Sequence, residues 1–340
     1  MKRCRWLLTS WCLFLISSAL SIPLAFGQTK SVNFTFATFF PAPHKAYIVV
    51  TEWGKEIEKR TDGRVKITFF PGSTLTPGDK CYDGVIRGIS DFGMADLAYT
   101  RGRFPLTEVF YLPLGYKNAL VATKMVNAFY KKFRPKELDE TKIMFFHAHG
   151  PGIIHTKKPV HKLEELKGMK IRSHGMSTKI VSALGATPVA MPMSDSYDAL
   201  QRGVTDGIIC PMEALEGWKL GEVVKSTTQD FSCAYTSAFF VTLNKDKWNS
   251  LPPDTQKIIE KVNEEWIEAI GKIWDEVDKS GREFTLKLGN QIISLPKEEE
   301  EKWTKATRPI FDEYVTTMKA KGLPAEEALK FCQDYLKKNQ

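Results

Sequence analysis

The sequence of 340 residues lacks most signals that identify enzymes and nucleic-acid-binding proteins. It has no HExxH, GxxxxGKS/T, GxSxG or complete GxGxxG motif, so the common metal-hydrolase, P-loop, esterase and dinucleotide sites find no support. It has no CxxC pair, which argues against a redox or zinc-ribbon site. Basic residues never form a run longer than two and alternate with acidic ones, which argues against nucleic acid or anionic lipid as the main partner.

The first 27 residues have the pattern of a removable export signal. Lys2, Arg3 and Arg5 precede an apolar run, and Ala25-Phe26-Gly27 forms a small-x-small cleavage site before Gln28. A membrane anchor is the alternative, but four serines, one threonine and a proline interrupt the run, and no later segment could span a bilayer. We therefore expect an exported protein that begins near Gln28, with 45 basic and 40 acidic residues and a net charge of +5.

The stretch 163–211 alternates short apolar segments with helical ones, which indicates a mostly parallel sheet. Arg172 ends the first expected strand of this stretch. Ligands of such sheets bind outside the carboxyl ends of the strands, so Arg172 is the leading candidate for a ligand-binding residue. We expect strands at 169–172, 187–191 and 204–209, and helices at 178–184 and 194–202.

The amino-terminal part repeats this rhythm. Its strands are expected at 33–38, 64–70 and 91–95, and its helices at 44–60 and 78–87. The segments 86–91 and 201–206 share a helix end, a glycine, an apolar residue, a hydroxyl residue and an aspartate. We expect both halves to use one supersecondary unit.

The carboxyl-terminal part is helical. Apolar residues with helical spacing predict a helix of more than 25 residues that begins at 252–254, with Trp266 and Trp274 interpreted as core residues. Single helices over 296–321 and 324–338 are expected to complete the chain. A mature chain of about 310 residues exceeds the usual size of one core, so two lobes are expected.

Cysteines and clustered histidines leave several alternatives open. Export permits a disulfide among Cys81, Cys210, Cys233 and Cys332, and the sequence does not select among the three connectivities. The group formed by His147, His149 and His155 allows a metal site, a polar lining of a cleft or ordinary packing. No acidic residue between residues 141 and 162 completes a metal site, and we expect none.

Several segments stand in the order found in a known family. They include Lys167-Gly168-Met169-Lys170-Ile171-Arg172 and Gly203-Val204-Thr205-Asp206-Gly207, and the others are 63–67 with 71–73, 185–188, 199–202, and 244–245 with 248–252. Together they cover nearly the whole mature chain. The sequence thereby resembles solute-binding proteins of tripartite ATP-independent periplasmic (TRAP) transporters, of the dicarboxylate-binding type.

The resemblance implies a two-lobed α/β periplasmic binding-protein fold with hinge strands and a long helix spanning both lobes. Under it we expect lobe I at 28–150 plus 236–285, and lobe II at 151–235 plus 286–340. It implies a periplasmic protein that captures a small organic acid and delivers it to a TRAP membrane permease, with no cofactor and no catalysis. It also implies that Arg172 meets the substrate carboxylate, which agrees with the bidentate geometry of guanidinium and carboxylate.

Three departures from the family pattern bear on the ligand. A second arginine that many members carry falls here near Gly152 and Ile153, Cys210 replaces a frequent asparagine, and a frequently aromatic position falls near Met193. With fewer polar groups, the pocket is expected to suit one carboxylate on an apolar or aromatic body in preference to a sugar acid or a compact dicarboxylate.

Other candidates for ligand contact are aromatic or polar residues near expected strand ends. Phe39 and Phe40 are the strongest, because two aromatic residues that end a strand are hard to bury on both faces. The full set of further candidates is Phe39, Phe40, His44, Ser73, Thr76, Tyr99, His149, Met193, Cys210, Pro211, Met212, Glu213, Trp218 and Tyr235.

Two alternatives to a transport function remain at this point. An exported metal-dependent α/β enzyme would use the histidines with a metal ion. A sensory binding protein would have the same fold and would signal to a receptor.

Overall fold

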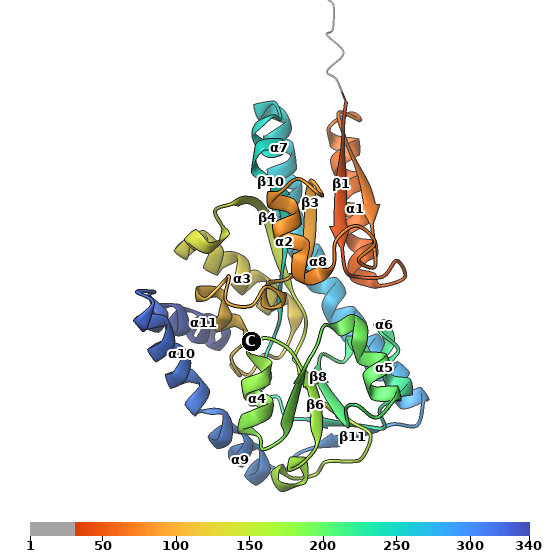
Figure 1. Ribbon diagram of the computed structural model, residues 1–340, viewed down its shortest axis with the longest axis vertical. Coiled ribbons are helices and arrows are strands. Elements are labelled where there is room, and N and C mark those ends of the chain that lie inside the picture. The colour runs from red at the N-terminus through yellow and green to blue at the C-terminus, as the bar shows by residue number, and fades with distance from the viewer. Residues whose placement is uncertain (1–30) are drawn as a thin grey trace, which may run out of the picture. The chain divides into compact units, whose positions relative to one another are not determined.

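A computed structural model describes residues 31–340, and the expected signal segment 1–27 lies outside the described residues. The first sheet has the strand order β2-β1-β3-β10-β4 (Figure 1). Strands β1, β2 and β3 are parallel, and β10 runs antiparallel to both of its neighbours. The strands are β1 Val32–Thr38, β2 Val65–Phe70, β3 Phe92–Asp96, β4 Thr141–Ala148 and β10 Ala238–Asn244.

The second sheet has the order β11-β9-β5-β8-β6-β7. Strand β6 lies parallel to β7 and β8, whereas β5 is antiparallel to β8 and β9. Its strands are β5 Ile153–Thr156, β6 Lys170–Ser173, β7 Thr187–Ala190, β8 Gly207–Cys210, β9 Ser226–Gln229 and β11 Gln291–Ser294. The expected parallel alternation is therefore confirmed around β6.

Two short connections carry the chain between the sheets, at 149–152 and at 230–237, and the helical segment 245–290 crosses a third time. The two short connections touch at an isolated antiparallel bridge in which Gly152 N donates to Tyr235 O at 2.7 Å. The aromatic ring of Tyr235 covers Gly152, because a Cβ atom at position 152 would lie 2.2 Å from that ring. A side chain at 152 therefore does not fit while Tyr235 keeps this position.

Helices flank both sheets. The long helix α8, Pro253–Lys287, packs against α1, α3 and β4 near the first sheet and against α6 and β11 near the second. The helices are α1 Lys45–Arg60, α2 Cys81–Ile86, α3 Ala119–Phe133, α4 Ser177–Ala183, α5 Ser196–Gln201, α6 Glu213–Gly217, α7 Lys245–Asn249, α9 Lys297–Thr307, α10 Pro309–Ala320 and α11 Ala325–Asn339.

Two carboxylates one turn apart on α8 fix helices beside both sheets. Asp275 accepts hydrogen bonds from Ala119 N and Leu120 N at the start of α3, at 2.6 and 3.2 Å. Asp278 accepts from Glu213 N at the start of α6, at 2.8 Å. Carboxylates satisfy the free N–H groups of a helix start, so α8 holds α3 and α6 at a fixed spacing.

The six-residue similarity between the halves corresponds to one shared structure. Gly88 and Gly203 follow α2 and α5 with φ values of +72° and +76°, which glycine adopts without strain. Asp91 Oδ2 then accepts from Thr35 N, and Asp206 Oδ2 accepts from Lys170 N, each at 2.8 Å. In both halves the aspartate binds the backbone of a neighbouring strand segment.

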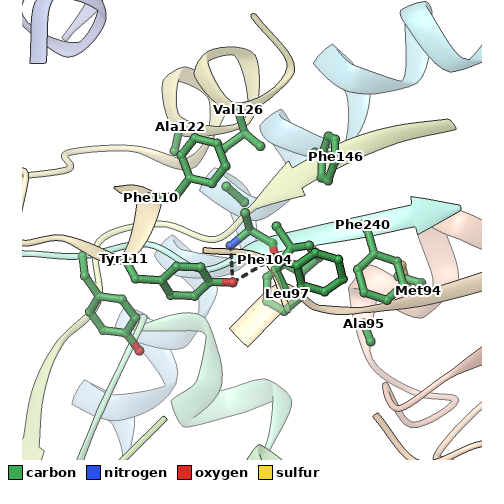
Figure 2. Close-up of a cluster of buried hydrophobic side chains, with 14 of the residues drawn as sticks. Met94, Ala95, Leu97, Phe104, Phe110, Tyr111, Ala122, Val126, Phe146 and Phe240 are labelled. Carbon is green, nitrogen blue, oxygen red and sulfur yellow. Dashed lines mark hydrogen bonds between the residues drawn. The ribbon is translucent and has the colours of Figure 1, made fainter. Parts of the chain in front are cut away.

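One buried cluster lies between the first sheet, α3 and the 3-10 segment Leu106–Tyr111. Figure 2 shows its side chains, which come from β3, β4, β10, α3 and the loop after β3. The hydroxyl of Tyr111 reaches into the cluster and lies within hydrogen-bond distance of Ala238 O and Ala98 N, at 3.1 and 3.2 Å. This contact fixes the loop that follows β3.

The prediction of a single helix over 296–321 is wrong. Two helices, α9 and α10, replace it, and Pro309 begins the second. Proline has no N–H and therefore cannot continue the hydrogen-bond ladder of α9. The strand expected at 204–209 begins only at Gly207, because the turn after Gly203 uses the preceding residues.

The residue division into lobes stays a prediction. Helix α9 packs near α4, whereas α11 packs against α3 beside the first sheet. Across residues 31–340, no helix is both long and apolar enough to cross a membrane.

Candidate functional site

Arg172 lies near the carboxyl end of β6 and is fully buried. Its Nε and Nη2 atoms donate to Met191 O, at 3.1 and 2.8 Å, and its Nη1 atom lies 3.5 Å from His174 Nδ1. No aspartate or glutamate within residues 31–340 forms an ion pair with it. A buried charge without a counter-ion is costly, so this position is prepared for an anion.

Asp96 faces His174 across the gap between the two sheets. Its Oδ2 atom lies 2.8 Å from His174 Nε2, and its Oδ1 atom accepts from Ala98 N at 2.9 Å and from the hydroxyl of Tyr111. Burial alone would raise the pKa of Asp96, but the contact with His174 and the hydrogen bonds from Tyr111 and Ala98 outweigh it and lower that pKa. Asp96 is therefore ionised.

An aromatic pocket lies beside these polar groups. Phe39 stands between Tyr99 and Trp218, with ring centroids 5.2 and 6.1 Å away. Phe239 stacks on Trp274 at 5.7 Å. The pocket lining is Phe39, Phe40, Asp96, Tyr99, His149, His174, Met193, Pro211, Glu213, Trp218, Tyr235, Ser237, Phe239 and Trp274.

The pocket is nearly closed. It contains about 340 Å³ of atom-free space, of which the centre of a water molecule can reach about 30 Å³. That is room for roughly two waters, so a larger ligand requires the walls to move apart. A neighbouring groove with about 830 Å³ of atom-free space shares Phe39, Tyr99 and His174 with the pocket and is also lined by Ser73 and Ser194.

A larger depression, with about 910 Å³ of atom-free space, continues this groove along Leu97, Arg101 and Met176. The aromatic cluster does not line it. We therefore place the site in the enclosed pocket, where aromatic rings and buried polar groups converge.

Glu213 forms a second buried contact between the sheets. Its Oε1 atom lies 2.7 Å from His44 Nε2, while His44 Nδ1 accepts from Ala46 N at the start of α1. Burial raises the pKa of the neighbouring Asp278 carboxyl well above its ordinary value, and the charge of Glu213 adds to this effect. Asp278 is therefore protonated over a range in which ordinary carboxyls are ionised.

The structure brings together most of the residues expected at the site. Phe39, Phe40, Tyr99, His149, Met193, Glu213, Trp218 and Tyr235 line the pocket. Arg172 lies directly behind this wall, since His174 in the wall contacts it and Met193 N, two residues beyond its acceptor Met191, donates to Tyr99 Oη at 3.2 Å.

Five other candidates do not line this pocket. Ser73 lines the groove, and His44 reaches the site through Glu213. Cys210 and Met212 are buried in the apolar cluster beneath the second sheet, and Thr76 packs against Gly84. A position at the end of a strand predicts that a residue lies near a cleft, but it does not predict which way the side chain points. The side chains of Cys210, Met212 and Thr76 point into the protein interior.

For the three histidines, the sequence left open a metal site, a polar lining of the cleft and ordinary packing. His149 lines the pocket, His147 accepts from Trp274 Nε1 at 2.9 Å, and His155 lies between Thr227 Oγ1 and Cys210 O at 2.9 and 3.0 Å. Burial lowers the pKa of His147 to about 3 and those of His149 and His155 to about 4. Within the described residues, no three His, Cys, Asp or Glu side chains gather as a metal site, and the four cysteines there are free.

Sequence reasoning missed Asp96, His174, Ser237 and Phe239 in the pocket lining, whereas the candidate Pro211 does line it. A usable signal existed for two of them. Asp96 is the last residue of β3 and His174 follows β6, so both meet the rule that selected Arg172. Trp274, interpreted as core, is buried and also lines the pocket.

Comparisons with known proteins cover nearly the whole described chain. The sequence profile of the bacterial extracellular solute-binding protein family 7 matches residues 36–317. The C4-dicarboxylate-binding periplasmic protein DctP of Rhodobacter capsulatus is 28% identical over 325 residues, which are 92% of this chain and 94% of that protein.

Two solved structures resemble the chain more specifically. A TRAP solute-binding protein from Rhodoferax ferrireducens T118, in complex with copurified benzoate, is 28% identical with a TM-score of 0.85 and covers 91% of this chain and 98% of its own. A TRAP solute-binding protein from a marine metagenome, specific for aromatic acid ligands and in complex with metahydroxyphenylacetate, is 28% identical with a TM-score of 0.86 and covers 91% and 99%.

Proposed function

Because this chain belongs to the bacterial extracellular solute-binding protein family 7, we propose that it captures a monocarboxylate with an aromatic body and delivers it to a TRAP membrane permease. The TRAP resemblance of the sequence and the two-lobed α/β fold are confirmed. The family consists of solute-binding proteins, and our proposal includes no catalytic step and no cofactor. It includes export and removal of the signal near residue 27, with the mature protein in the periplasm.

The buried guanidinium of Arg172 carries the proposal. Within residues 31–340 it has no ion-pair partner, and its Nη1 atom lies 3.5 Å from His174 Nδ1. A ligand carboxylate would supply the missing counter-ion through parallel N–H···O bonds. In a buried pair, loss of one partner costs roughly 3–5 kcal/mol.

The aromatic side chains that line the pocket are the reason for proposing a ligand with an aromatic body. Tyr235 occupies the space above Gly152, the place to which the family resemblance assigns a second arginine. The residues that line the pocket include no lysine or arginine that could bind the second carboxylate of a compact dicarboxylate. Seven aromatic side chains line the pocket, namely Phe39, Phe40, Tyr99, Trp218, Tyr235, Phe239 and Trp274. The relatives solved with benzoate and with metahydroxyphenylacetate support this ligand class.

Closure around the ligand uses contacts that cross between the sheets. His174 to Asp96 and His44 to Glu213 are two of them, and Met193 N donating to Tyr99 Oη is a third. They would break when the pocket opens and reform over a bound ligand. A ligand that meets groups from both sides favours the closed state by its differential affinity.

Calorimetry on protein that has been unfolded and refolded to remove bound ligand tests the proposal. Benzoate and 3-hydroxyphenylacetate should bind at least tenfold more tightly than succinate and glucuronate. Quenching or enhancement of tryptophan fluorescence should accompany binding, and a Trp218→Phe variant should show less of it than a Trp266→Phe control. Tightest binding of succinate or glucuronate would overturn the ligand class.

A further inference from the structure

The imidazole of His174 lies between the two buried charged groups of the site, Asp96 and Arg172. Its Nε2 atom lies 2.8 Å from Asp96 Oδ2 and 3.1 Å from Ser237 Oγ. Its Nδ1 atom has one polar neighbour, Arg172 Nη1 at 3.5 Å. The ring nitrogen Nε2 therefore contacts the Asp96 carboxylate, whereas Nδ1 faces the Arg172 guanidinium, the proposed binding site of the ligand carboxylate.

Asp96 decides which nitrogen carries the first proton. An ionised carboxylate accepts a hydrogen bond, so His174 Nε2 must be the donor. Burial lowers the pKa of His174, and although Asp96 opposes this effect, Arg172 adds to it. The ring is thus neutral without ligand, and its Nδ1 atom carries a lone pair.

A carboxylate at Arg172 changes the charge balance of this dry site. Without ligand, the buried charges of Arg172 and Asp96 are opposite and equal in number. A bound carboxylate leaves one excess negative charge and meets the lone pair of Nδ1. A proton on Nδ1 removes both penalties, because it restores neutrality and supplies another hydrogen-bond donor.

We propose that His174 is a second carboxylate-binding residue, which takes up one proton when the ligand enters and then donates from Nδ1 to a ligand oxygen. The inference rests on the proposed function, because it requires a carboxylate at Arg172. Asp96 acts as a positioning residue that holds the imidazolium from behind. The ligand therefore enters the pocket together with a proton.

The other titratable groups around His174 do not take this role. Both ring nitrogens of His149 already have a polar partner, since Nδ1 lies 2.5 Å from Gly150 O and Nε2 accepts from Ser237 N at 3.0 Å. Burial raises the pKa of Tyr99 to about 12 and those of Tyr111 and Tyr235 as well, so these hydroxyls stay protonated. Arg172 keeps its charge throughout.

The expected pH dependence has a definite sign. A ligand carboxylate raises the pKa of His174, so the complex binds a proton that the free protein does not. Affinity therefore increases about tenfold per unit as the pH falls from the pKa in the complex toward the pKa in the free protein. Outside this pH window, the contribution of His174 to the ligand affinity does not change with pH.

Calorimetry in phosphate, HEPES and Tris buffers at about pH 6, 7 and 8 measures the proton uptake directly, with benzoate as the probe. The binding heat should vary with the ionisation enthalpy of the buffer, with a slope approaching one proton per ligand within the pH window. His174→Gln keeps polar groups but cannot titrate, so its slope should be near zero and its binding weaker. Asp96→Asn should also lower the slope, because charge balance no longer requires the proton.

Two variants serve as controls. His161 is exposed, so His161→Gln should retain the full slope. Loss of the slope in His149→Gln but not in His174→Gln would overturn the assignment. Nitrogen NMR of the bound wild-type protein should show both ring nitrogens of His174 protonated, which needs no variant to fold.

The two proposals fail in different ways. Binding of benzoate at all three pH values without proton uptake would overturn the role of His174 and leave the proposed function intact. Absence of binding by any carboxylate would overturn both.

Discussion

Replacement of Arg172 by methionine should abolish most ligand binding while leaving the ligand-free protein folded. The two properties separate because Arg172 has no ion-pair partner within the described residues in the absence of ligand. Methionine keeps a similar length and apolar bulk and removes only the charge and the hydrogen bonds to Met191 O. The effect on binding should therefore far exceed the effect on folding.

The magnitudes follow from the burial of the guanidinium. Loss of one partner from a buried pair costs about 3–5 kcal/mol, which is two to three orders of magnitude or more in affinity. On folding, hydrogen bonds to Met191 O contribute about 1–3 kcal/mol, and removal of a buried charge without an acidic partner offsets part of this loss. The free energy of unfolding of the ligand-free protein should therefore change by less than about 2 kcal/mol.

Calorimetry with benzoate and urea unfolding of the ligand-free protein measure the two quantities. Arg202→Met is the matched control, since Arg202 is exposed at the end of α5, and it should leave both quantities unchanged. Arg172→Lys should recover only part of the affinity, because an ammonium cannot form the planar bidentate pair. Wild-type affinity in Arg172→Met would refute the reasoning.

Three further substitutions test other parts of the account. Gly152→Ala should weaken benzoate binding in calorimetry, because its Cβ atom would lie 2.2 Å from the Tyr235 ring and displace it; unchanged affinity would show that Tyr235 does not shape the site. Asp278 has a pKa raised by burial, so its contribution to stability is full below about pH 4 and is lost as the pH rises. Asp278→Asn should therefore be more stable relative to wild type at pH 8 than at pH 4 in urea unfolding, and an equal difference at both pH values would contradict this pKa. Gly203→Ala should cost about 1 kcal/mol of unfolding free energy through its φ of +76° alone, since the surrounding space is open, and ligand affinity should not change.

Local signals predicted much of the fold. Glycine turns and apolar periodicity identified the strand and helix alternation around Arg172, and the shared segment ending in Asp91 and Asp206 proved to be one structure in both halves. The helix boundary at Pro309 was missed, although proline gives a physical reason for it. Helical periodicity continues across the break and does not reveal it.

The site was predictable only in part, because a residue at the end of a strand does not always line the pocket. Arg172, Asp96 and His174 all lie at or just after the carboxyl ends of strands, and the same rule would have selected all three. Cys210 satisfies that rule and nevertheless lies in the apolar cluster. The contact between His174 and Asp96 joins residues 78 positions apart, and single-sequence periodicity holds no information about such pairs.

The most direct test of the central claim is a crystal structure with the aromatic carboxylate that binds most tightly. The account predicts a carboxylate oxygen within about 3.2 Å of a guanidinium nitrogen of Arg172, with the ring of the ligand among Phe39, Trp218 and Tyr235. A carboxylate bound elsewhere, with no ligand atom in contact with the guanidinium of Arg172, would contradict it.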